Sequence, residues 1–202
     1  MNLVVLGATG RTGRLVVEQA LAAGHTVTAL VRSPEKLTTS SPNLRVVTGE
    51  ATDRAAVSRA LEGADAVISA LGGNGTVIAD STSAIVAAAR QAGVSRIVVL
   101  SSWLVERDRM HGLTRALTGL TMGTMIKDKN AGEQVLRQSD LDWTIAYASP
   151  LSDGPAGGSV VVLPEGARRN LSQKISRADV AAWMLQTAAG DEHRRRSVGI
   201  TG

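Results

Sequence analysis

The chain has 202 residues, of which 44% are hydrophobic and 20% charged, as in an ordinary globular protein, and we expect residues 1–202 to form one domain. The absence of cysteine excludes disulfides, thiolate metal sites and a cysteine nucleophile, and the three histidines are too dispersed to suggest a metal centre. The net charge is +4, but the basic residues are scattered and aromatic residues are few, so we do not expect nucleic-acid binding.

Two further features bear on where the protein works. No apolar run reaches the roughly 18 residues that a membrane span needs. The chain also enters its first predicted strand directly after Met1, which leaves no room for a signal peptide. We therefore expect a cytoplasmic protein that does not bind membranes.

The first motif is a glycine-rich turn between a strand, Asn2–Leu6, and a helix, Arg11–Ala23. In this setting the free N–H groups at the helix start, and the positive end of its dipole, face a pyrophosphate. Glycine is needed because a Cβ would meet the phosphates or the strand. The spacing Gly-x-x-Gly-x-x-Gly is typical of the short-chain dehydrogenase/reductase group. We therefore predict that a dinucleotide is bound by Gly7, Thr9, Gly10, Arg11, Thr12 and Gly13.

Short apolar strands and helical patterns alternate over the first half of the chain. The further strands are Thr26–Val31, Arg45–Thr48, Ala66–Ala70 and Arg96–Leu100, and the helices between them are Arg54–Glu62 and Ser81–Gln91. Asp53 and Asp80 are placed as N-caps, and Gly24, Gly63 and Gly93 as helix ends. This alternation predicts an α/β fold with a doubly wound parallel sheet, the Rossmann fold, in the strand order 3-2-1-4-5. The ligand crevice then opens between the first and fourth strands.

After Leu100 the alternation changes. A polar stretch, Glu106–Thr118, leads to elements that we predict as helix Met125–Ser139, strand Asp142–Tyr147, loop Ala148–Gly158, strand Ser159–Leu163 and helix Arg177–Ala189 capped by Ser176. In this architecture such additions at the carboxyl edge of the sheet form the substrate pocket. We expect substrate contacts from about 103–127 and 148–170, among them Trp103, Pro150 and Leu151.

Arg32 ends the second strand, where a dinucleotide fold places the adenosine ribose. An acid at this tip binds the 2′-hydroxyl of NAD, whereas an arginine pairs with the 2′-phosphate of NADP. Ser33 and Lys36 follow in support, and the first acid is Glu35. NADP(H) is therefore the expected cofactor, with a solvated surface arginine as the alternative.

The third and fourth strands end in residues suited to the same ligand. Glu50 and Ala51 stand in a stretch that resembles the Gly-Asp-(Ala/Val)-x-Asp segment lining adenine in the short-chain group, while Asp53 reads as a helix cap. The fourth strand ends in a small-residue segment that lets backbone approach the ribose and diphosphate, with a flexible loop as the alternative: Ala70, Leu71 and Gly72.

Two serines end the fifth strand near the expected nicotinamide position. A serine in short-chain reductases polarises the substrate carbonyl or fixes the nicotinamide face. We assign Ser102 to catalysis and Ser101 to cofactor binding, with a structural pair of serines as the alternative.

The catalytic tyrosine of short-chain reductases is missing. In that group a Tyr-x-x-x-Lys pair on the helix after the fifth strand supplies the general acid. Here Met125 takes the place of the tyrosine, and the chain's one tyrosine, Tyr147, lies on the sixth predicted strand. Lys129 occupies the place of the lysine that holds the nicotinamide ribose, and we count it with Ser102 as catalytic. Without a tyrosine acid, the acceptor should take its proton from water.

These residues resemble the atypical short-chain reductases of the NAD(P)H-binding, NmrA-like type, most closely the biliverdin reductase B/flavin reductase branch. Beyond the glycine turn, the resemblance is carried by Leu30–Arg32, Glu133–Thr144, Leu151–Pro155 and Ile175–Ala181. It implies monomeric reductases that use NADPH to reduce flavins, linear tetrapyrroles or quinones. This chain has Pro150 where that branch carries a histidine, and Arg107–Lys129 matches it poorly.

The leading hypothesis is an NADPH-dependent oxidoreductase that transfers hydride to a planar small molecule, a flavin or quinone, as a monomer or weak homodimer. Two alternatives remain open. One is a regulator that senses NADP(H) without turnover, as some NmrA-like proteins do. The other is a reductase or isomerase that acts on one metabolite of a biosynthetic pathway.

Overall fold

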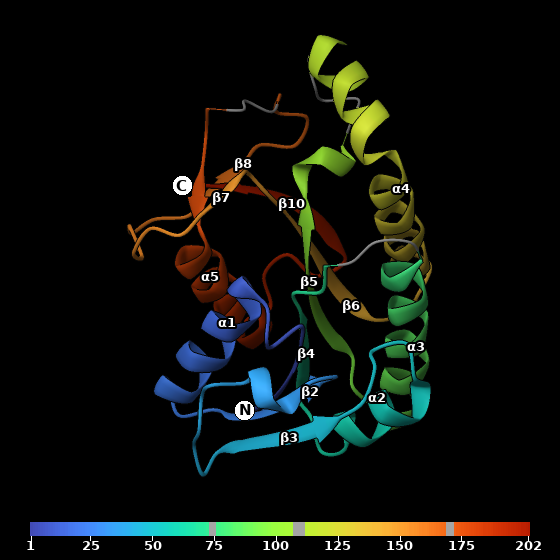
Figure 1. Ribbon diagram of the computed structural model, residues 1–202, viewed down its shortest axis with the longest axis vertical. Helices are drawn as coiled ribbons and strands as arrows, with labels where there is room; N and C mark the ends of the chain where they lie inside the picture. The colour runs from blue at the N-terminus through green and yellow to red at the C-terminus, as the bar shows by residue number, and fades with distance from the viewer. Residues whose placement is uncertain (73–75, 107–111, 169–171) are drawn as a thin grey trace.

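An eight-stranded sheet forms the middle layer of the protein, in the order β3-β2-β1-β4-β5-β6-β10-β8 (Figure 1). The computed structural model describes residues 1–72, 76–106, 112–168 and 172–202. The strands of the sheet are β1 (Asn2–Leu6), β2 (Thr26–Val31), β3 (Leu44–Thr48), β4 (Ala66–Ser69), β5 (Arg96–Ser102), β6 (Asp142–Ala148), β8 (Val161–Leu163) and β10 (Arg196–Thr201). All neighbours pair in parallel except β8, which is antiparallel to β10. The predicted order 3-2-1-4-5 and the doubly wound fold are confirmed.

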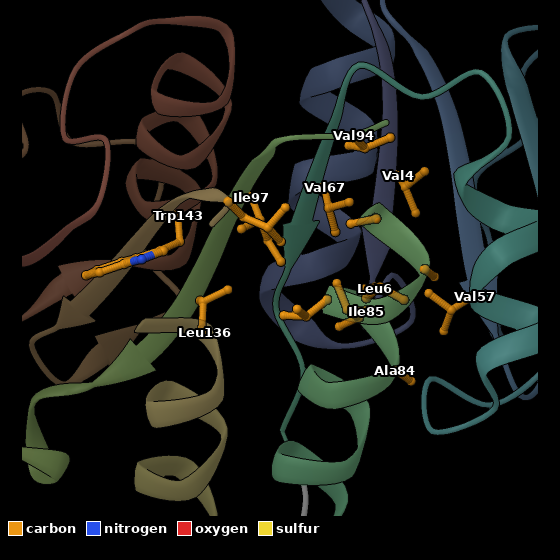
Figure 2. Close-up of a cluster of buried hydrophobic side chains, with 14 of the residues drawn as sticks. Val4, Leu6, Val57, Val67, Ala84, Ile85, Val94, Ile97, Leu136 and Trp143 are labelled. Carbon is orange, nitrogen blue, oxygen red and sulfur yellow. The ribbon is translucent and has the colours of Figure 1, made fainter. Parts of the chain in front are cut away.

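Helices cover both faces of this sheet (Figure 1). One face carries α1 (Arg11–Ala22) and α5 (Arg177–Ala189), and the other carries α2 (Arg54–Leu61), α3 (Val77–Ala92) and α4 (Gly112–Arg137). Side chains of successive strand residues point to opposite faces, so Val4 and Leu6 pack toward α2 and α3 while Leu3 and Val5 pack toward α1. Figure 2 shows the first of these two cores. No helix in the described ranges combines the length and apolar character of a membrane span.

Helix α3 begins four residues before the predicted start, and Asp80 is not its N-cap. The helix starts at Val77, and Asp80 lies in its first turn, where it accepts a hydrogen bond from Thr76. The free N–H groups of Ile78 and Ala79 are bound by Asp128 of α4, at 3.0 and 2.9 Å. A cap that comes from so far along the chain leaves no local sequence signal, which explains the wrong prediction.

Helix α4 is also longer than predicted. It begins at Gly112, not near Met125, so part of the expected polar stretch is helical, while residues 107–111 of that stretch lie outside the described ranges. Gly119 and Gly123 lie within this helix, and a helix-interior glycine costs only about 1 kcal/mol relative to alanine.

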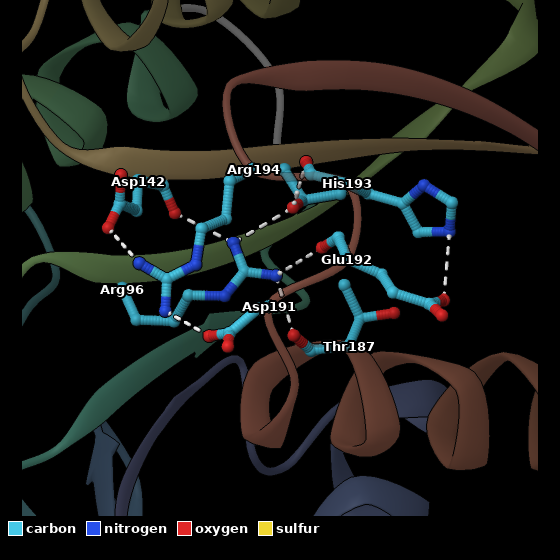
Figure 3. Close-up of polar contacts among 8 residues, drawn as sticks. Arg96, Asp142, Thr187, Asp191, Glu192, His193 and Arg194 are labelled. Carbon is cyan, nitrogen blue, oxygen red and sulfur yellow. Dashed lines mark hydrogen bonds and ion pairs between the residues drawn. The ribbon is translucent and has the colours of Figure 1, made fainter.

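The last strand, β10, was not predicted, and a buried arginine links its neighbourhood to the sheet. The Arg96 side chain, 5% exposed at the start of β5, donates hydrogen bonds to the carbonyl oxygens of Asp142 and Thr187 and to Thr144 Oγ1 (Figure 3). Desolvation by burial lowers its pKa, and the nearby charge of Arg194 acts in the same direction. Arg96 therefore joins β5, β6 and α5 at the end of the sheet opposite the ligand crevice.

Candidate functional site

The glycine turn lies where the sequence placed it, between β1 and α1. Gly7 has a φ of 79°, and the N–H of Gly10 donates to its carbonyl oxygen at 2.9 Å. A Cβ on Gly7 would lie 2.6 Å from the carbonyl oxygen of Ala70, and a Cβ on Gly13 would overlap the carbonyl oxygen of Gly7. The turn is therefore packed against the end of β4 and against the first turn of α1, with no space for side chains at these two positions.

A cleft of about 310 Å³ opens above this turn at the carboxyl edge of β1 to β4. It brings together most of the residues predicted to bind the cofactor, namely Gly7, Thr9, Gly10, Arg32, Glu50, Ala51, Ala70, Leu71 and Gly72. Arg32 and Glu50 are exposed at the ends of β2 and β3, on the side expected for adenosine. Six lining residues were not predicted: Leu30, Val31, Gly49, Thr52, Val77 and Ser81.

Ser81 gives this cleft a polar group that lacks a protein partner. Its side chain is fully buried, and its Oγ has no hydrogen-bond partner among the described residues, although it lines the cleft. A buried hydroxyl without a partner is costly, so such a group points to a ligand that completes it. Together with the glycine cradle, Ser81 makes the cleft fit the hydroxyl and phosphate groups of a dinucleotide.

Six residues of the predicted cofactor set do not line the cleft: Ser101 and Lys129 line a neighbouring cavity, and a further four, Arg11, Thr12, Gly13 and Lys36, line neither space. Thr12 and Gly13 are buried within α1, behind the turn, and Lys36 is exposed in the short 3-10 helix η1 (Pro34–Lys36). The exposed Arg11 side chain forms an ion pair with Asp153 instead of facing the cleft. Contact between these four residues and a cofactor remains a prediction.

A second, smaller cavity of about 20 Å³ lies beside the cleft, between β5 and helices α3 and α4. Leu71 lines both spaces, which places them next to each other. The smaller cavity is lined by Ser101 and Lys129, predicted near the nicotinamide, and by Glu133. Desolvation by burial lowers the pKa of the Lys129 ammonium, while the charges of Glu133 and Asp128 act to raise it.

Glu133 is the centre of a buried polar network that the sequence did not predict. Its carboxylate, in a side chain 4% exposed, accepts hydrogen bonds from Ser101 at 2.6 Å, from Arg137 at 3.1 Å and from the hydroxyl of Tyr147. Ser101 and Tyr147 are paired directly across β5 and β6. Burial and the charge of Glu133 raise the pKa of Tyr147, so its phenol stays protonated as a donor to Glu133.

Ser102 and Trp103 have structural contacts of their own. Ser102 lies next to Ser101 on the strand, and its Oγ accepts a hydrogen bond from the N–H of Leu104 in the 3-10 helix η2 (Trp103–Val105) at 3.3 Å. Trp103 is 4% exposed and packs in the core on the α3 and α4 face. The catalytic role of Ser102 and substrate contact by Trp103 stay predictions.

The predicted substrate loop, residues 148–158, is tied to the start of α5. Within it, the short strand β7 (Leu151–Ser152) pairs in parallel with β9 (Ile175–Ser176), and Pro150 accepts the N–H of Ile175 at 3.1 Å. Asp153 forms ion pairs with both Arg11 and Arg177, which joins the loop to α1 and α5. The loop therefore has a defined position beside the glycine turn, whereas residues 169 and 170 of the predicted region lie outside the described ranges.

Asp179 fastens the other end of the same loop. Its carboxylate accepts the N–H groups of Gly157, at 3.0 and 3.1 Å, and of Gly158, and the hydroxyl of Ser176 at 2.6 Å. Burial raises the pKa of Asp179, but these hydrogen bonds outweigh it and bring the pKa below the ordinary value of an aspartate. In return the side chain of Ser176, which is the predicted N-cap of α5, accepts a hydrogen bond from the N–H of Asp179.

The described residues contain no group of three or more histidine, aspartate or glutamate side chains placed to hold a metal ion. The donors of the two cavities are instead backbone amides, hydroxyls, one ammonium and one guanidinium. This set suits an anionic organic ligand.

Comparison with known proteins gives a consistent picture. The family described as NAD(P)H-binding matches residues 7–191. A (4-alkanoyl-5-oxo-2,5-dihydrofuran-3-yl)methyl phosphate reductase of Streptomyces griseus is 32% identical over 99% of this chain and 67% of its own length.

Two solved structures share the fold. A short-chain dehydrogenase/reductase from Veillonella parvula, in complex with NADP, has a TM-score of 0.87 at 19% identity and covers 100% of this chain and 94% of its own. The anaerobilin reductase ChuY of Escherichia coli O157:H7 has a TM-score of 0.85 at 25% identity and covers 99% of this chain and 96% of its own.

Proposed function

The chain belongs to the NAD(P)H-binding family of atypical short-chain reductases, and from this premise we propose that it transfers hydride from NADPH to a planar acceptor, a flavin or quinone. One observation carries the proposal. The dinucleotide cleft and the cavity of Ser101, Lys129 and Glu133 share Leu71 as a common wall, so a cofactor lying in the cleft ends beside ionisable groups.

The strand order gives the cofactor its direction. Arg32 and Glu50 stand at the ends of β2 and β3, so the adenosine half lies on that side of the glycine turn. The nicotinamide half then extends past β4 toward the end of β5, where Ser101 and Lys129 lie. A protein that only senses the dinucleotide has less need for a lysine at this end, which favours turnover.

When bound, NADPH supplies the hydride. The glycine turn holds the pyrophosphate with backbone amides, Arg32 pairs with the 2′-phosphate, and Lys129 holds the nicotinamide ribose. Ser102 contacts the nicotinamide or the acceptor, which rests against the loop of residues 148–158. Catalysis of this kind depends mainly on proximity and orientation of the two planar groups.

The test is to mix the purified protein with NADPH and FMN, FAD or menadione and to follow the loss of NADPH absorbance against a protein-free control. We expect oxidation with at least one acceptor, and slower oxidation of NADH than of NADPH. Tight binding of NADPH without oxidation by any flavin or quinone would contradict the proposal. That result would favour the sensing alternative.

A second candidate is a reductase of one pathway metabolite. It is favoured by the relative from Streptomyces griseus, whose name describes reduction of a furanone phosphate. The described residues around the proposed acceptor position are compatible with this candidate, because they are side chains and a loop rather than a flavin-specific motif. Turnover with a phosphorylated furanone, but with no flavin or quinone, would favour this candidate. A linear tetrapyrrole belongs in the same assay because ChuY is an anaerobilin reductase.

A further inference from the structure

Lys129 is an ionisable group in the wall of the smaller cavity, beside the dinucleotide cleft. It shares the smaller cavity with Ser101 and Glu133, next to the end of the dinucleotide cleft at Leu71. It also precedes Glu133 by one turn on α4, so the two side chains lie on one face of the helix. Burial lowers the pKa of Lys129, and an ammonium in this condition releases its proton more readily than an exposed lysine.

We propose that Lys129, rather than water directly, delivers the proton that the acceptor takes up with the hydride, and that Glu133 is the positioning residue that keeps Lys129 protonated until then. The inference rests on the proposed reductase function. An Nζ–H bond of Lys129 breaks, the proton moves to the negatively charged oxygen or nitrogen of the reduced acceptor, and the neutral amine regains a proton from water. One NADPH and one proton are consumed for each acceptor reduced.

Glu133 is suited to this role because its carboxylate is fixed. Ser101, Arg137 and Tyr147 together bind both of its oxygens. A fixed anion one helical turn from Lys129 stabilises the ammonium form and offsets the effect of burial. Tyr147 does not replace the missing tyrosine acid, because its hydroxyl already donates to Glu133 and its pKa is raised.

Each element around Lys129 bears on its titration. Its own helix provides two carboxylates and, across Glu133, one guanidinium: Asp128, Glu133 and Arg137. Strand β6 provides Tyr147, which is protonated at neutral pH. The walls from β5 and α3 provide side chains that do not titrate near neutral pH, namely Ser101, Ile78 and Thr82. Glu133 is thus a buried anion bound on both oxygens within one turn of Lys129.

The kinetic test replaces Lys129 by arginine, which keeps a positive charge for the cofactor but does not release a proton at accessible pH. For Lys129→Arg we expect NADPH affinity within about threefold of wild type, while kcat falls about 100-fold, the scale of general acid catalysis. The fall of kcat at high pH, where the wild-type ammonium is lost, should disappear. Lys174→Arg, at an exposed position, is the matched control and should change none of these quantities.

Glu133→Gln tests the positioning role through the same pH profile. Loss of the carboxylate charge should move the high-pH fall of kcat to lower pH, because the ammonium form of Lys129 is then less stable. Tyr147→Phe keeps that charge and should move it less. If Glu133→Gln does not fold, the pH profile of Tyr147→Phe is measured in its place.

A readout without turnover is the ¹³Cε NMR titration of the chain's four lysines in the cofactor-free protein. The Lys129 signal, assigned by its loss in Lys129→Arg, should titrate below the ordinary lysine value of about 10.4 and lower still in Glu133→Gln. An unshifted Lys129, or a Lys129→Arg enzyme that keeps kcat and its high-pH fall, would overturn the inference and leave the reductase proposal standing. If the wild-type protein fails to oxidise NADPH whichever acceptor is supplied, both the inference and the reductase proposal are overturned.

Discussion

On the β1 to β4 side of the sheet, the candidate site is shaped by backbone, with Gly7 and Gly13 in contact and the cleft floor made of strand ends. On the β5 and β6 side it is shaped by side chains. Three donors bind the carboxylate of Glu133, and the carboxylate of Asp179 accepts hydrogen bonds from backbone amides of the loop. Where a surface is built from backbone, added side-chain atoms should change stability and binding, whereas pH should change them little. A surface built from carboxylates responds to charge, so the two sides should fail under different treatments.

The largest effect is expected from Gly13→Ala. Its Cβ would overlap the carbonyl oxygen of Gly7, a backbone atom that cannot move without opening the turn. We expect unfolding free energy to fall by about 3 kcal/mol and NADPH binding to be lost at all pH values. Gly123→Ala is the matched control, because it is also within a helix but no atom of the described residues lies within 4 Å of the added Cβ.

Urea unfolding and NADPH titration at several pH values measure these effects. Gly123→Ala should be as stable as wild type or up to about 1 kcal/mol more stable. A Gly13→Ala protein of wild-type stability would show that backbone contact does not shape this side.

Arg32→Ala should act on affinity rather than on stability. Loss of hydrogen bonds between a guanidinium and the 2′-phosphate weakens NADPH binding by about 1.5–3 kcal/mol, or roughly 10- to 150-fold, and leaves NADH binding nearly unchanged. Arg90→Ala, an exposed arginine paired with Asp140 away from the cleft, is the control. Equal losses for NADPH and NADH, measured by titration calorimetry, would place the 2′-phosphate elsewhere.

Asp179→Asn tests the pH response of the β5 and β6 side of the site. Because the folded pKa of Asp179 is below its unfolded value of about 4, its ionised form stabilises the protein fully above that value, and the contribution is lost as pH falls through the folded pKa. The variant should lose about 1 kcal/mol at neutral pH, since hydrogen bonds to a carboxylate are replaced by weaker ones. Its unfolding free energy should then fall less steeply than that of wild type below pH about 4.

Denaturant unfolding from pH 7 downward measures both quantities. Between neutral pH and pH about 5 the two proteins should differ by a constant amount, because Asp179 is ionised throughout. Parallel curves across the acid range would contradict the proposed pH response.

The smallest effect is expected from Asp153→Ala. Asp153 pairs with Arg11 and Arg177, but its side chain is 57% exposed, and ion pairs at such positions contribute from nothing to about 1 kcal/mol. We therefore expect a change in unfolding free energy below about 0.5 kcal/mol that vanishes at high salt. A larger, salt-independent loss would show that this pair holds the loop more firmly than its exposure indicates.

The same division explains what the sequence could predict. The positions of the glycine turn and of Arg32, and the strand order, depend on neighbouring residues and on right-handed crossovers, so local patterns were sufficient to predict them. The Glu133 network depends on β5 and β6 being paired so that Ser101 faces Tyr147, and no local pattern encodes that register. The start of α3 was misplaced for a similar reason, since Asp128 caps it from 50 residues along the chain.

Ser81 shows how such a residue becomes visible only in the folded chain. In the sequence it was simply the first residue of a predicted helix, whereas in the structure it is a buried residue that lines the cleft and whose hydroxyl has no partner among the described residues. Finding Ser81 would have required the correct start of α3, and that start depends on the distant carboxylate of Asp128. The residues of α3 that line the cleft could therefore not be found from local patterns.

The closed glycine turn has a thermodynamic consequence. Because Gly10 already donates to Gly7 and α1 already packs against that carbonyl, the amides at the start of α1 are oriented before any ligand arrives. An anion that binds them loses its own freedom but orders little of the protein, so the conformational entropy cost at this end is small. The preorganised part of the site thus lies at the glycine turn, where the pyrophosphate common to all such dinucleotides would bind, and any adaptation to different ligands falls to the β5 and β6 side.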